Sequence, residues 1–227
     1  MIKVVLTGAS RGIGKATALR LAKLGAQLAL VGQHSESLKD TLDALESTAP
    51  KPLCIECDLR DHQSCIDAAT AALDQMGTPD AIIHNAGAIF RQSVEDTTLE
   101  HWEAQMAINA RAPFLITREM LPALREAGTG RIVHVASISA TLGTAGSAAY
   151  NASKWAVVGW MKSLAEELRD SGLMTCAILP GSVSTRMLEG SGFEARMTPD
   201  EVAQSILHYA LDAPIAHNGG VIEMFGV

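Results

Sequence analysis

The chain has 227 residues, of which 48% are hydrophobic and 19% charged, the composition of a globular protein that can bury a sizeable core. Its formal net charge of −7 and the scattered positions of its 18 lysines and arginines argue against a nucleic-acid partner. It has no apolar stretch long enough to span a bilayer and no signal-peptide signature at its start, so we expect a cytoplasmic protein without a membrane partner.

Short apolar runs recur along the chain in the way that buried parallel strands do. Helical patterns fill the intervals between them, and the first of these ends at Gly25, where a glycine cap fits. Alternating strands and helices predict right-handed βαβ units and a parallel sheet covered on both faces, an α/β fold in one domain over 1–227. The predicted strands are 2–7, 27–31, 52–56, 80–84, 131–136, 174–179 and 220–225.

The first predicted strand runs directly into TGASRGIG at 7–14, and a helical pattern follows. Its glycines form G-x-x-x-G-x-G, a variant of the dinucleotide-binding motif placed at the first strand-to-helix junction. We expect Gly8 to permit the turn, Gly12 to let the backbone approach a pyrophosphate, and Gly14 to let the helix pack on the strand. A tight turn that binds nothing is the alternative.

The residues after the second strand bear on the choice of nucleotide. A carboxylate about 20 residues beyond the motif would bind the ribose of NAD, whereas basic residues accommodate the 2′-phosphate of NADP. The strand ends in Gly32-Gln33-His34, without a carboxylate, and Arg11 lies within the glycine loop. The sequence therefore favours NADPH/NADP over NADH/NAD. Asp58, which ends the third strand, would bind an adenine amine or serve only as a turn residue.

The segment GSAAYNASK at 146–154 places a tyrosine and a lysine four residues apart among small side chains. On a helix, Tyr150 and Lys154 lie on one face about one turn apart. Reducing a ketone builds negative charge on oxygen and needs a proton donor. Tyr150 can supply that proton, and we expect the cation of Lys154 to lower the pKa of the phenol. A surface tyrosine is the alternative.

Two further loops follow predicted strands. We expect the small residues at Asn85, Ala86 and Gly87 to let adenosine lie close, with a turn glycine as the alternative. The segment PGSVSTRM at 180–187 either meets the cofactor or is an ordinary loop. Cys54 and Cys57 face opposite sides of a strand, and no histidine or carboxylate spacing indicates a metal, so we predict reduced cysteines and no metal site.

Taken together, TGASRGIG, HNAG at 84–87, Asn109, Ser137, YNASK at 150–154 and PGSVSTRM resemble the classical short-chain dehydrogenases/reductases, and the match covers nearly the whole chain. The chain is most similar in character to 3-oxoacyl-acyl-carrier-protein reductases and related carbonyl reductases. The resemblance implies a seven-stranded doubly wound sheet, a mainly dinucleotide-binding half at 1–90, a catalytic half at 91–227, and a homotetramer or homodimer. His84 departs from the family, which usually has asparagine there.

The resemblance also implies roles for individual residues. Ser137 would hold the carbonyl oxygen, Lys154 would bind the nicotinamide ribose, and Asn109 would keep a water in a proton relay from Lys154. The catalytic set is thus Asn109, Ser137, Tyr150 and Lys154. The cofactor-binding set adds Gly8, Ser10, Arg11, Gly12, Ile13, Gly14, Gln33, His34, Asp58, Leu59, Asn85, Ala86, Gly87, Pro180, Gly181, Val183 and Thr185 to Tyr150 and Lys154.

These features predict an NADPH-dependent reductase of a small carbonyl substrate. The competing hypotheses are an NAD-dependent alcohol or polyol dehydrogenase and a non-catalytic NADP-binding scaffold. We expect 184–197 to form a mobile lid over the pocket, with Arg186 and Arg196 either meeting an anionic substrate or lying in solvent. Trp155, Gly159 and Ser163 form a helical stripe that serves either as an oligomer interface or as core packing.

Overall fold

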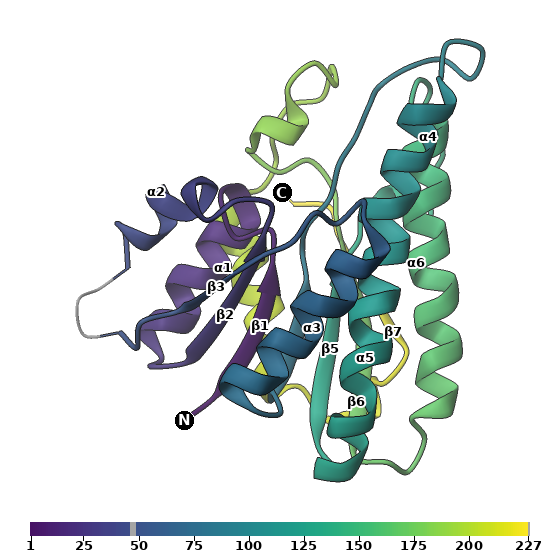
Figure 1. The fold of residues 1–227 in the computed structure, drawn as a ribbon. Coiled ribbons are helices and arrows are strands. Elements are labelled where there is room, and N and C mark those ends of the chain that lie inside the picture. The colour runs from purple at the N-terminus through teal and green to yellow at the C-terminus, as the bar shows by residue number, and fades with distance from the viewer. Residues whose placement is uncertain (46–48, 227) are drawn as a thin grey trace.

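The computed structural model describes residues 1–45 and 49–226 and contains one seven-stranded parallel sheet (Figure 1). The strands lie in the order β3-β2-β1-β4-β5-β6-β7. The predicted fold class is therefore confirmed, and each predicted strand is present within one or two residues of its expected ends. The strands are β1 Lys3–Thr7, β2 Gln27–Gly32, β3 Leu53–Glu56, β4 Ala81–His84, β5 Gly130–Val135, β6 Leu173–Pro180 and β7 Gly220–Met224.

Helices cover both faces of the sheet. Helices α1 and α7 pack together on one face, while α3 and α5 pack on the other, with α6 beside them (Figure 1). A π-helical turn at Ala107–Arg111 joins α4 to α5. The α-helices are α1 Gly12–Lys23, α2 Lys39–Leu42, α3 His62–Met76, α4 Leu99–Met106, α5 Ala112–Ala127, α6 Ala148–Glu167 and α7 Pro199–Leu207.

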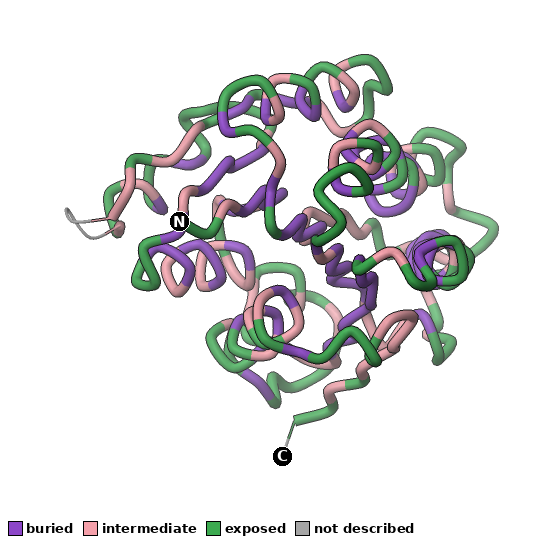
Figure 2. Tube along the Cα trace, turned by 90° about the horizontal axis from the view of Figure 1, so that it is seen from below, coloured by how far each residue is buried: buried purple, intermediate pink, exposed green. Residues whose placement is uncertain are grey.

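The core is the sheet itself, which forms the buried layer in Figure 2. Every residue of β4 and all eight residues of β6 are buried, because helices lie on both sides of these strands. This double burial explains why the strands appear in the sequence as continuous apolar runs rather than as alternating patterns. The chain order reverses between β1 and its two neighbours, which opens a crevice at the carboxyl ends of β1 and β4.

Three smaller expectations have outcomes in the structure. Gly25 ends α1 with a φ of +71°, the left-handed conformation that suits a glycine cap. Cys54 is exposed and Cys57 buried, so they face opposite sides as predicted, and both are free thiols. Trp155, Gly159 and Ser163 are all exposed on α6, so the core-packing alternative for this stripe is wrong.

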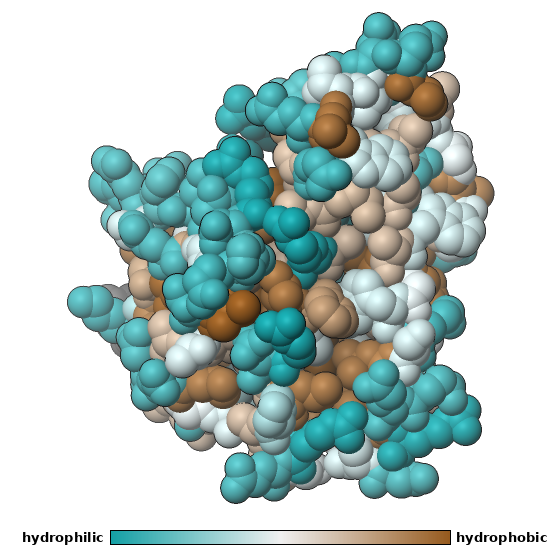
Figure 3. Space-filling view, turned by 45° about the vertical axis from the view of Figure 1, so that its right-hand side comes forward, coloured by the Kyte–Doolittle hydropathy of each residue, from teal (hydrophilic) through white to brown (hydrophobic). Residues whose placement is uncertain are grey.

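The face formed by α5 and α6 carries a large area of apolar and near-neutral side chains bordered by hydrophilic ones (Figure 3). Phe114 on α5 and Trp155 on α6 are about half exposed there. Among the described residues, no helix has both the length and the apolar character needed to cross a membrane.

Candidate active site

A large cleft runs along the carboxyl ends of β1, β4 and β5 and has a volume of about 1230 Å³. One end is lined by the glycine loop at 8–14 and the other by Tyr150 and Lys154. The cleft thus lies at the point where the strand order reverses, the position at which open α/β sheets bind nucleotides. The structure brings together in one cavity two sequence motifs that are more than 130 residues apart.

The glycine loop packs directly against the segment that follows β4. Gly8 has a φ of +72°, and a Cβ atom there would lie 2.7 Å from the Cα of Ala86. A Cβ on Gly14 would lie 2.1 Å from the carbonyl oxygen of Gly8 and 2.4 Å from Nδ2 of Asn85. Both glycines are therefore required by close approach of neighbouring atoms, which confirms the turn and packing roles predicted for them.

The first turn of α1 presents backbone amides toward the cleft. Arg11 is the N-cap residue, and its side chain makes no capping hydrogen bond to the first turn of α1. Such a helix N-terminus binds anions through its free N–H groups and its dipole. A pyrophosphate fits this cradle, so these residues are suited to hold a nicotinamide dinucleotide.

Asn85 ties the glycine loop to β4. Its Nδ2 donates to the carbonyl oxygens of Gly8 at 3.0 Å and Thr7 at 3.2 Å, while Thr7 Oγ1 accepts from the backbone N–H groups of Asn85 and Ala86. Asn85, Ala86 and Gly87 all line the cleft. Thr7 is a positioning residue that the sequence analysis missed, although its place before the first glycine was a signal.

The part of the cleft beside the carboxyl ends of β2 and β3 is where adenosine is expected to bind. Three residues of the predicted cofactor-binding set, Gln33, His34 and Leu59, line the cleft there. Asp58 does not line it: its Oδ2 accepts from Nη2 of Arg60 at 2.8 Å, and its Oδ1 accepts from the Arg60 backbone N–H. Arg60 thereby lowers the pKa of the Asp58 carboxyl. This geometry matches the turn alternative for Asp58, and its contact with adenine stays a prediction.

Tyr150 and Lys154 lie on one face of α6, as their spacing predicts. They are 6% and 4% exposed, and Lys154 Nζ lies 5.6 Å from the centroid of the Tyr150 ring. Lys154 Nζ donates to the carbonyl oxygen of Val135 at 3.2 Å, which ties the lysine to the end of β5. Ser137, two residues beyond β5, accepts a hydrogen bond at Oγ from the Ser139 backbone N–H.

Burial dominates the electrostatics of this pair. It raises the pKa of Tyr150, which the nearby Ser137 hydroxyl and the charge of Arg91 partly offset. Burial also lowers the pKa of Lys154 to about 8. The net shift is opposite to the expected lowering, because desolvation of the phenol dominates and the Lys154 ammonium bonds to the Val135 carbonyl oxygen instead of the phenol oxygen.

Asn109 lies in the π-helical turn between α4 and α5. Its Oδ1 accepts from the Ala88 N–H, and its Nδ2 donates to the Ala88 carbonyl oxygen and to Ser153 Oγ, all within 2.9 Å. A Cβ on Gly87 would lie 3.4 Å from both Asn109 Oδ1 and Lys154 Nζ. Gly87 therefore keeps a gap between these two groups, and a relay water in that gap stays a prediction.

The family profile for short chain dehydrogenases matches residues 3–194. The chain belongs to the short-chain dehydrogenase family. It is 29% identical to a 3-oxoacyl-[acyl-carrier-protein] reductase of Synechocystis sp., over 95% of this chain and 92% of that protein.

Solved structures agree with this assignment. The chain superposes on the crystal structure of levodione reductase with a TM-score of 0.92 at 29% identity, over 99% of this chain and 96% of that one. A protein of Beutenbergia cavernae, assigned as an NAD(P)-dependent gluconate 5-dehydrogenase and solved with NADP at low occupancy, gives a TM-score of 0.91 at 29% identity, over 99% and 95%. The protein is therefore an oxidoreductase of the short-chain dehydrogenase family.

His84, which replaces the asparagine usual in this family, does not face the cleft. Its Nε2 lies 2.8 Å from Thr117 Oγ1 on α5, and its ring stacks on His134 of β5 with 5.0 Å between centroids. Both rings are buried, and desolvation lowers the pKa of His84 to about 3. The departure from the family pattern therefore alters the core behind the site and leaves the cleft wall intact.

In the segment after β6, one part is held by structural contacts and another part reaches the cleft. Pro180, Gly181 and Val183 belong to the first part. The Gly181 N–H donates to the Met224 carbonyl oxygen, and Val183 forms a β-bridge with Met197. Thr185 lines the cleft, with its methyl group 3.1 Å from the Cβ position of Gly12. The cofactor contacts predicted for Pro180, Gly181 and Val183 stay predictions.

Two residues near the reactive tyrosine were missed by the sequence analysis. The Tyr150 hydroxyl donates to Met187 Sδ at 4.0 Å, so this methionine covers the hydroxyl that we predict to be catalytic. Arg91 donates from Nη2 to the Met187 carbonyl oxygen at 2.8 Å and from Nη1 to that of Glu189 at 3.4 Å. Met187 ends the PGSVSTRM motif, but the motif did not indicate a contact with Tyr150, and no motif or periodicity included Arg91.

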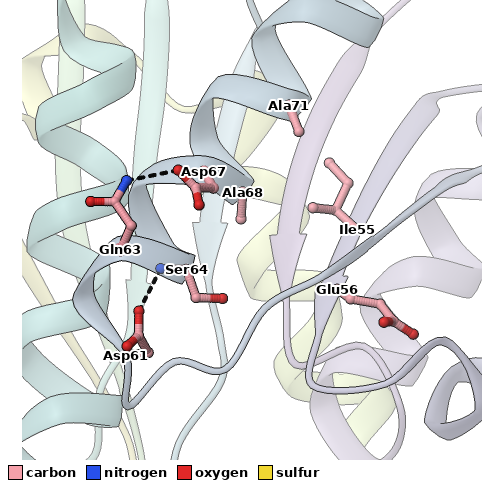
Figure 4. Close-up of a pocket in the computed structure, with 8 residues that line it drawn as sticks. All are labelled: Ile55, Glu56, Asp61, Gln63, Ser64, Asp67, Ala68 and Ala71. Carbon is pink, nitrogen blue, oxygen red and sulfur yellow. Dashed lines mark hydrogen bonds between the residues drawn. The ribbon is translucent and has the colours of Figure 1, made fainter.

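A second, smaller hollow of about 420 Å³ lies between β3 and the start of α3 (Figure 4). Its acidic side chains have structural partners: Asp61 caps α3 by accepting from the Ser64 N–H, Asp67 accepts from Gln63, and Glu56 accepts from the Ser35 N–H. No group of three or more ligand side chains in the described part of the chain is arranged to hold a metal ion.

The pH dependence of stability tests the burial of Lys154. An unfolded lysine titrates near ~10.4, whereas the pKa in the folded protein is about 8, so between these values the unfolded chain binds more protons and stability rises with pH. We expect the free energy of unfolding, measured by urea denaturation, to rise more steeply above pH ~8 in the wild type than in Lys154→Met. The exposed Lys162→Met on the same helix should retain the wild-type slope. Parallel curves for the wild type and Lys154→Met would contradict the burial of a cation at this position.

Proposed function

We propose that the protein is an NADPH-dependent carbonyl reductase that converts a ketone or 3-oxoacyl-type substrate to a secondary alcohol. The observation that carries the proposal is the placement of Tyr150 and Lys154 at the end of a cleft whose other end is a dinucleotide-type glycine loop, with the Ser137 hydroxyl close enough to Tyr150 to affect its pKa. The names of similar proteins support it, since they include a 3-oxoacyl-[acyl-carrier-protein] reductase and levodione reductase.

The protonation states of the site favour reduction. When bound, a reduced nicotinamide supplies the hydride, and the carbonyl oxygen then takes up negative charge. Because burial raises the pKa of Tyr150, the phenol remains protonated at neutral pH and can donate its proton to that oxygen. The Ser137 hydroxyl can donate a second hydrogen bond to the same oxygen. Lys154, a cation below about pH 8, lies over the ring and stabilises the phenolate as it forms.

The protonation state of Tyr150 also favours reduction over the main alternative function, alcohol oxidation. An NAD-dependent alcohol or polyol dehydrogenase needs Tyr150 as a base, that is, as a phenolate in the resting enzyme. Desolvation disfavours the charged phenolate, and a protonated phenol at neutral pH suits reduction better than oxidation.

Charge at the adenosine end supports NADPH as the cofactor. Arg11, Gln33 and His34 line that end of the cleft, and no carboxylate lines it in the part of the chain that the structure describes. Glu56, which ends β3 nearby, accepts from the Ser35 N–H and belongs to the separate hollow of Figure 4. The similar Beutenbergia cavernae protein was solved with NADP.

The proposal includes a small-molecule substrate and self-association rather than a nucleic-acid or membrane partner. The α5 and α6 face suits a homotetramer or homodimer interface because it is largely apolar and near-neutral (Figure 3). Phe114, Trp155, Gly159 and Ser163 are exposed there. A cytoplasmic location fits the four free thiols, a state that a reducing compartment maintains.

Tyr150→Phe removes the proposed proton donor and little else. We expect NADPH-dependent reduction of a panel of ketones, β-ketoesters and acyl thioesters to fall by ~100-fold or more, while cofactor binding measured by calorimetry is retained. The matched control is Tyr209→Phe, the chain's other tyrosine, which lies outside the cleft and should keep full activity. Equal activity of Tyr150→Phe and the wild type would remove the proposed role.

Arg11→Gln tests the cofactor preference. We expect the dissociation constant of NADPH to rise roughly tenfold and that of NADH to change much less, because the arginine would meet only the 2′-phosphate. Arg169→Gln, an exposed arginine paired with Glu166, should change neither constant. Tighter binding of NADH than of NADPH by the wild type would contradict the NADPH assignment.

Sedimentation velocity tests the interface. We expect the wild type to sediment as a dimer or tetramer at micromolar concentration, and Trp155→Glu to shift it toward the monomer, because a charge in an apolar interface is costly to desolvate. The control is Glu194→Gln, an exposed substitution in the lid segment and outside α5 and α6, which should leave the sedimentation coefficient distribution unchanged. A monomeric wild type would rule out the oligomer.

A further inference from the structure

The cleft concentrates positive charge in a protein that is acidic overall. The whole chain has a formal charge of −7, yet no aspartate or glutamate of the described chain lines the cleft. Such a cleft favours ligands that carry more than one negative charge. The five cationic side chains that line it are Arg11, Lys15, Arg91, Lys154 and Arg186.

Four of these cations have roles or positions that explain them. Arg11 and Lys15 lie at the glycine loop, where the phosphates of a dinucleotide would bind, and Lys154 belongs to the catalytic pair. Arg186 belongs to the lid segment, directly after Thr185, whose methyl group lies 3.1 Å from the Cβ position of Gly12. Arg91 remains, at the end of the cleft that holds Tyr150.

The backbone at Arg91 is held on both sides. Before it, the Phe90 N–H donates to Gln105 Oε1 at 3.0 Å, and the Phe90 ring stacks on His101 with 4.3 Å between centroids. After it, the Gln92 N–H donates to the Gly146 carbonyl oxygen at 2.9 Å, and Gln92 forms a β-bridge with Ser147 at the start of α6. Arg91 is therefore anchored to the helix that carries Tyr150.

The charge of Arg91 is not neutralised by a carboxylate. Its guanidinium donates to two backbone carbonyl oxygens of the lid segment, those of Met187 and Glu189, and none of the ion pairs within the described residues includes it. A guanidinium has five N–H donors, so further donors remain for a ligand. The positive charge also reaches the Tyr150 hydroxyl, where it helps to lower the pKa that burial raises.

We propose that Arg91 is a specificity-determining residue that binds a carboxylate of the substrate beside the carbonyl group held by Tyr150 and Ser137. The inference rests on the proposed function and narrows it: the substrates are oxo acids, reduced to hydroxy acids. A planar guanidinium matches a carboxylate with two parallel hydrogen bonds, which would fix the position of the carbonyl relative to the phenol. The N–H donors that the lid carbonyl oxygens leave free would bind the carboxylate.

The test compares each acid with its neutral ester. Pyruvate, acetoacetate and levulinate place the carboxylate at increasing distance from the ketone, and each has a methyl ester of nearly the same shape. With NADPH, we expect the wild type to prefer at least one acid over its ester in kcat/KM by about tenfold or more, the lower end of what a charge-assisted hydrogen bond contributes. In Arg91→Met that preference should disappear while activity on the ester persists.

Further variants distinguish recognition of the substrate carboxylate by Arg91 from a lid clamp, that is, a role of Arg91 only in holding the lid segment in place. Arg91→Lys keeps a cation and should keep part of the preference, with the loss appearing mainly in KM. Arg196→Met changes an arginine of the lid segment that does not line the cleft and should behave as the wild type. Thermal unfolding of Arg91→Met checks that this exposed substitution leaves the fold intact.

Each remaining outcome decides against one of the two proposals. Equal losses on acid and ester in Arg91→Met would show a lid clamp and overturn the inference, as would a wild type that reduces esters without preferring any acid. A wild type that reduces no carbonyl compound at all would overturn the proposed function, and this inference with it.

Discussion

The structure depends on the burial of one ammonium group at the end of a parallel sheet. Lys154 is almost fully enclosed, and its hydrogen bond to the Val135 carbonyl oxygen joins α6 to β5 at the place where the cleft ends. Enclosing a cation is unfavourable, and that penalty appears as a pKa of about 8 rather than the ordinary value of a lysine. A group tuned in this way can exchange protons close to neutral pH. The same burial keeps the neighbouring phenol protonated.

Two cations thus act around Tyr150 from different sides. Lys154 lies over the ring and is fixed by the sheet, whereas Arg91 comes from a loop and holds the lid segment through its carbonyl groups. Met187 links the two regions, because its sulfur accepts from the Tyr150 hydroxyl while its backbone accepts from Arg91. In the proposed function, opening of the 184–197 segment would break contacts that also orient the Tyr150 hydroxyl.

Much of the fold was predictable because its signals are local. Double burial makes each strand a short apolar run, and tight packing makes Gly8 and Gly14 visible as a motif. The shared face of Tyr150 and Lys154 follows from helix geometry. The direction of the Tyr150 pKa shift was mispredicted, because it depends on desolvation, which spacing in the sequence does not encode.

Other parts of the site depend on contacts between distant segments. Met187 contacts Tyr150 and Arg91 contacts Met187 only in the folded chain, and although Met187 ends the PGSVSTRM motif, the motif does not show which side chain it meets. Asp58 illustrates the opposite case, because its carboxylate pairs with Arg60, only two residues away. Its position at the end of a strand did not indicate this local partner. The most direct measurement of the central claim is a crystal structure of the protein with oxidised NADP and a bound carbonyl substrate. The account predicts that the Tyr150 and Ser137 hydroxyls both contact the substrate oxygen, with Met187 displaced from the phenol. A substrate bound elsewhere, with the Tyr150 hydroxyl still on the Met187 sulfur, would contradict it.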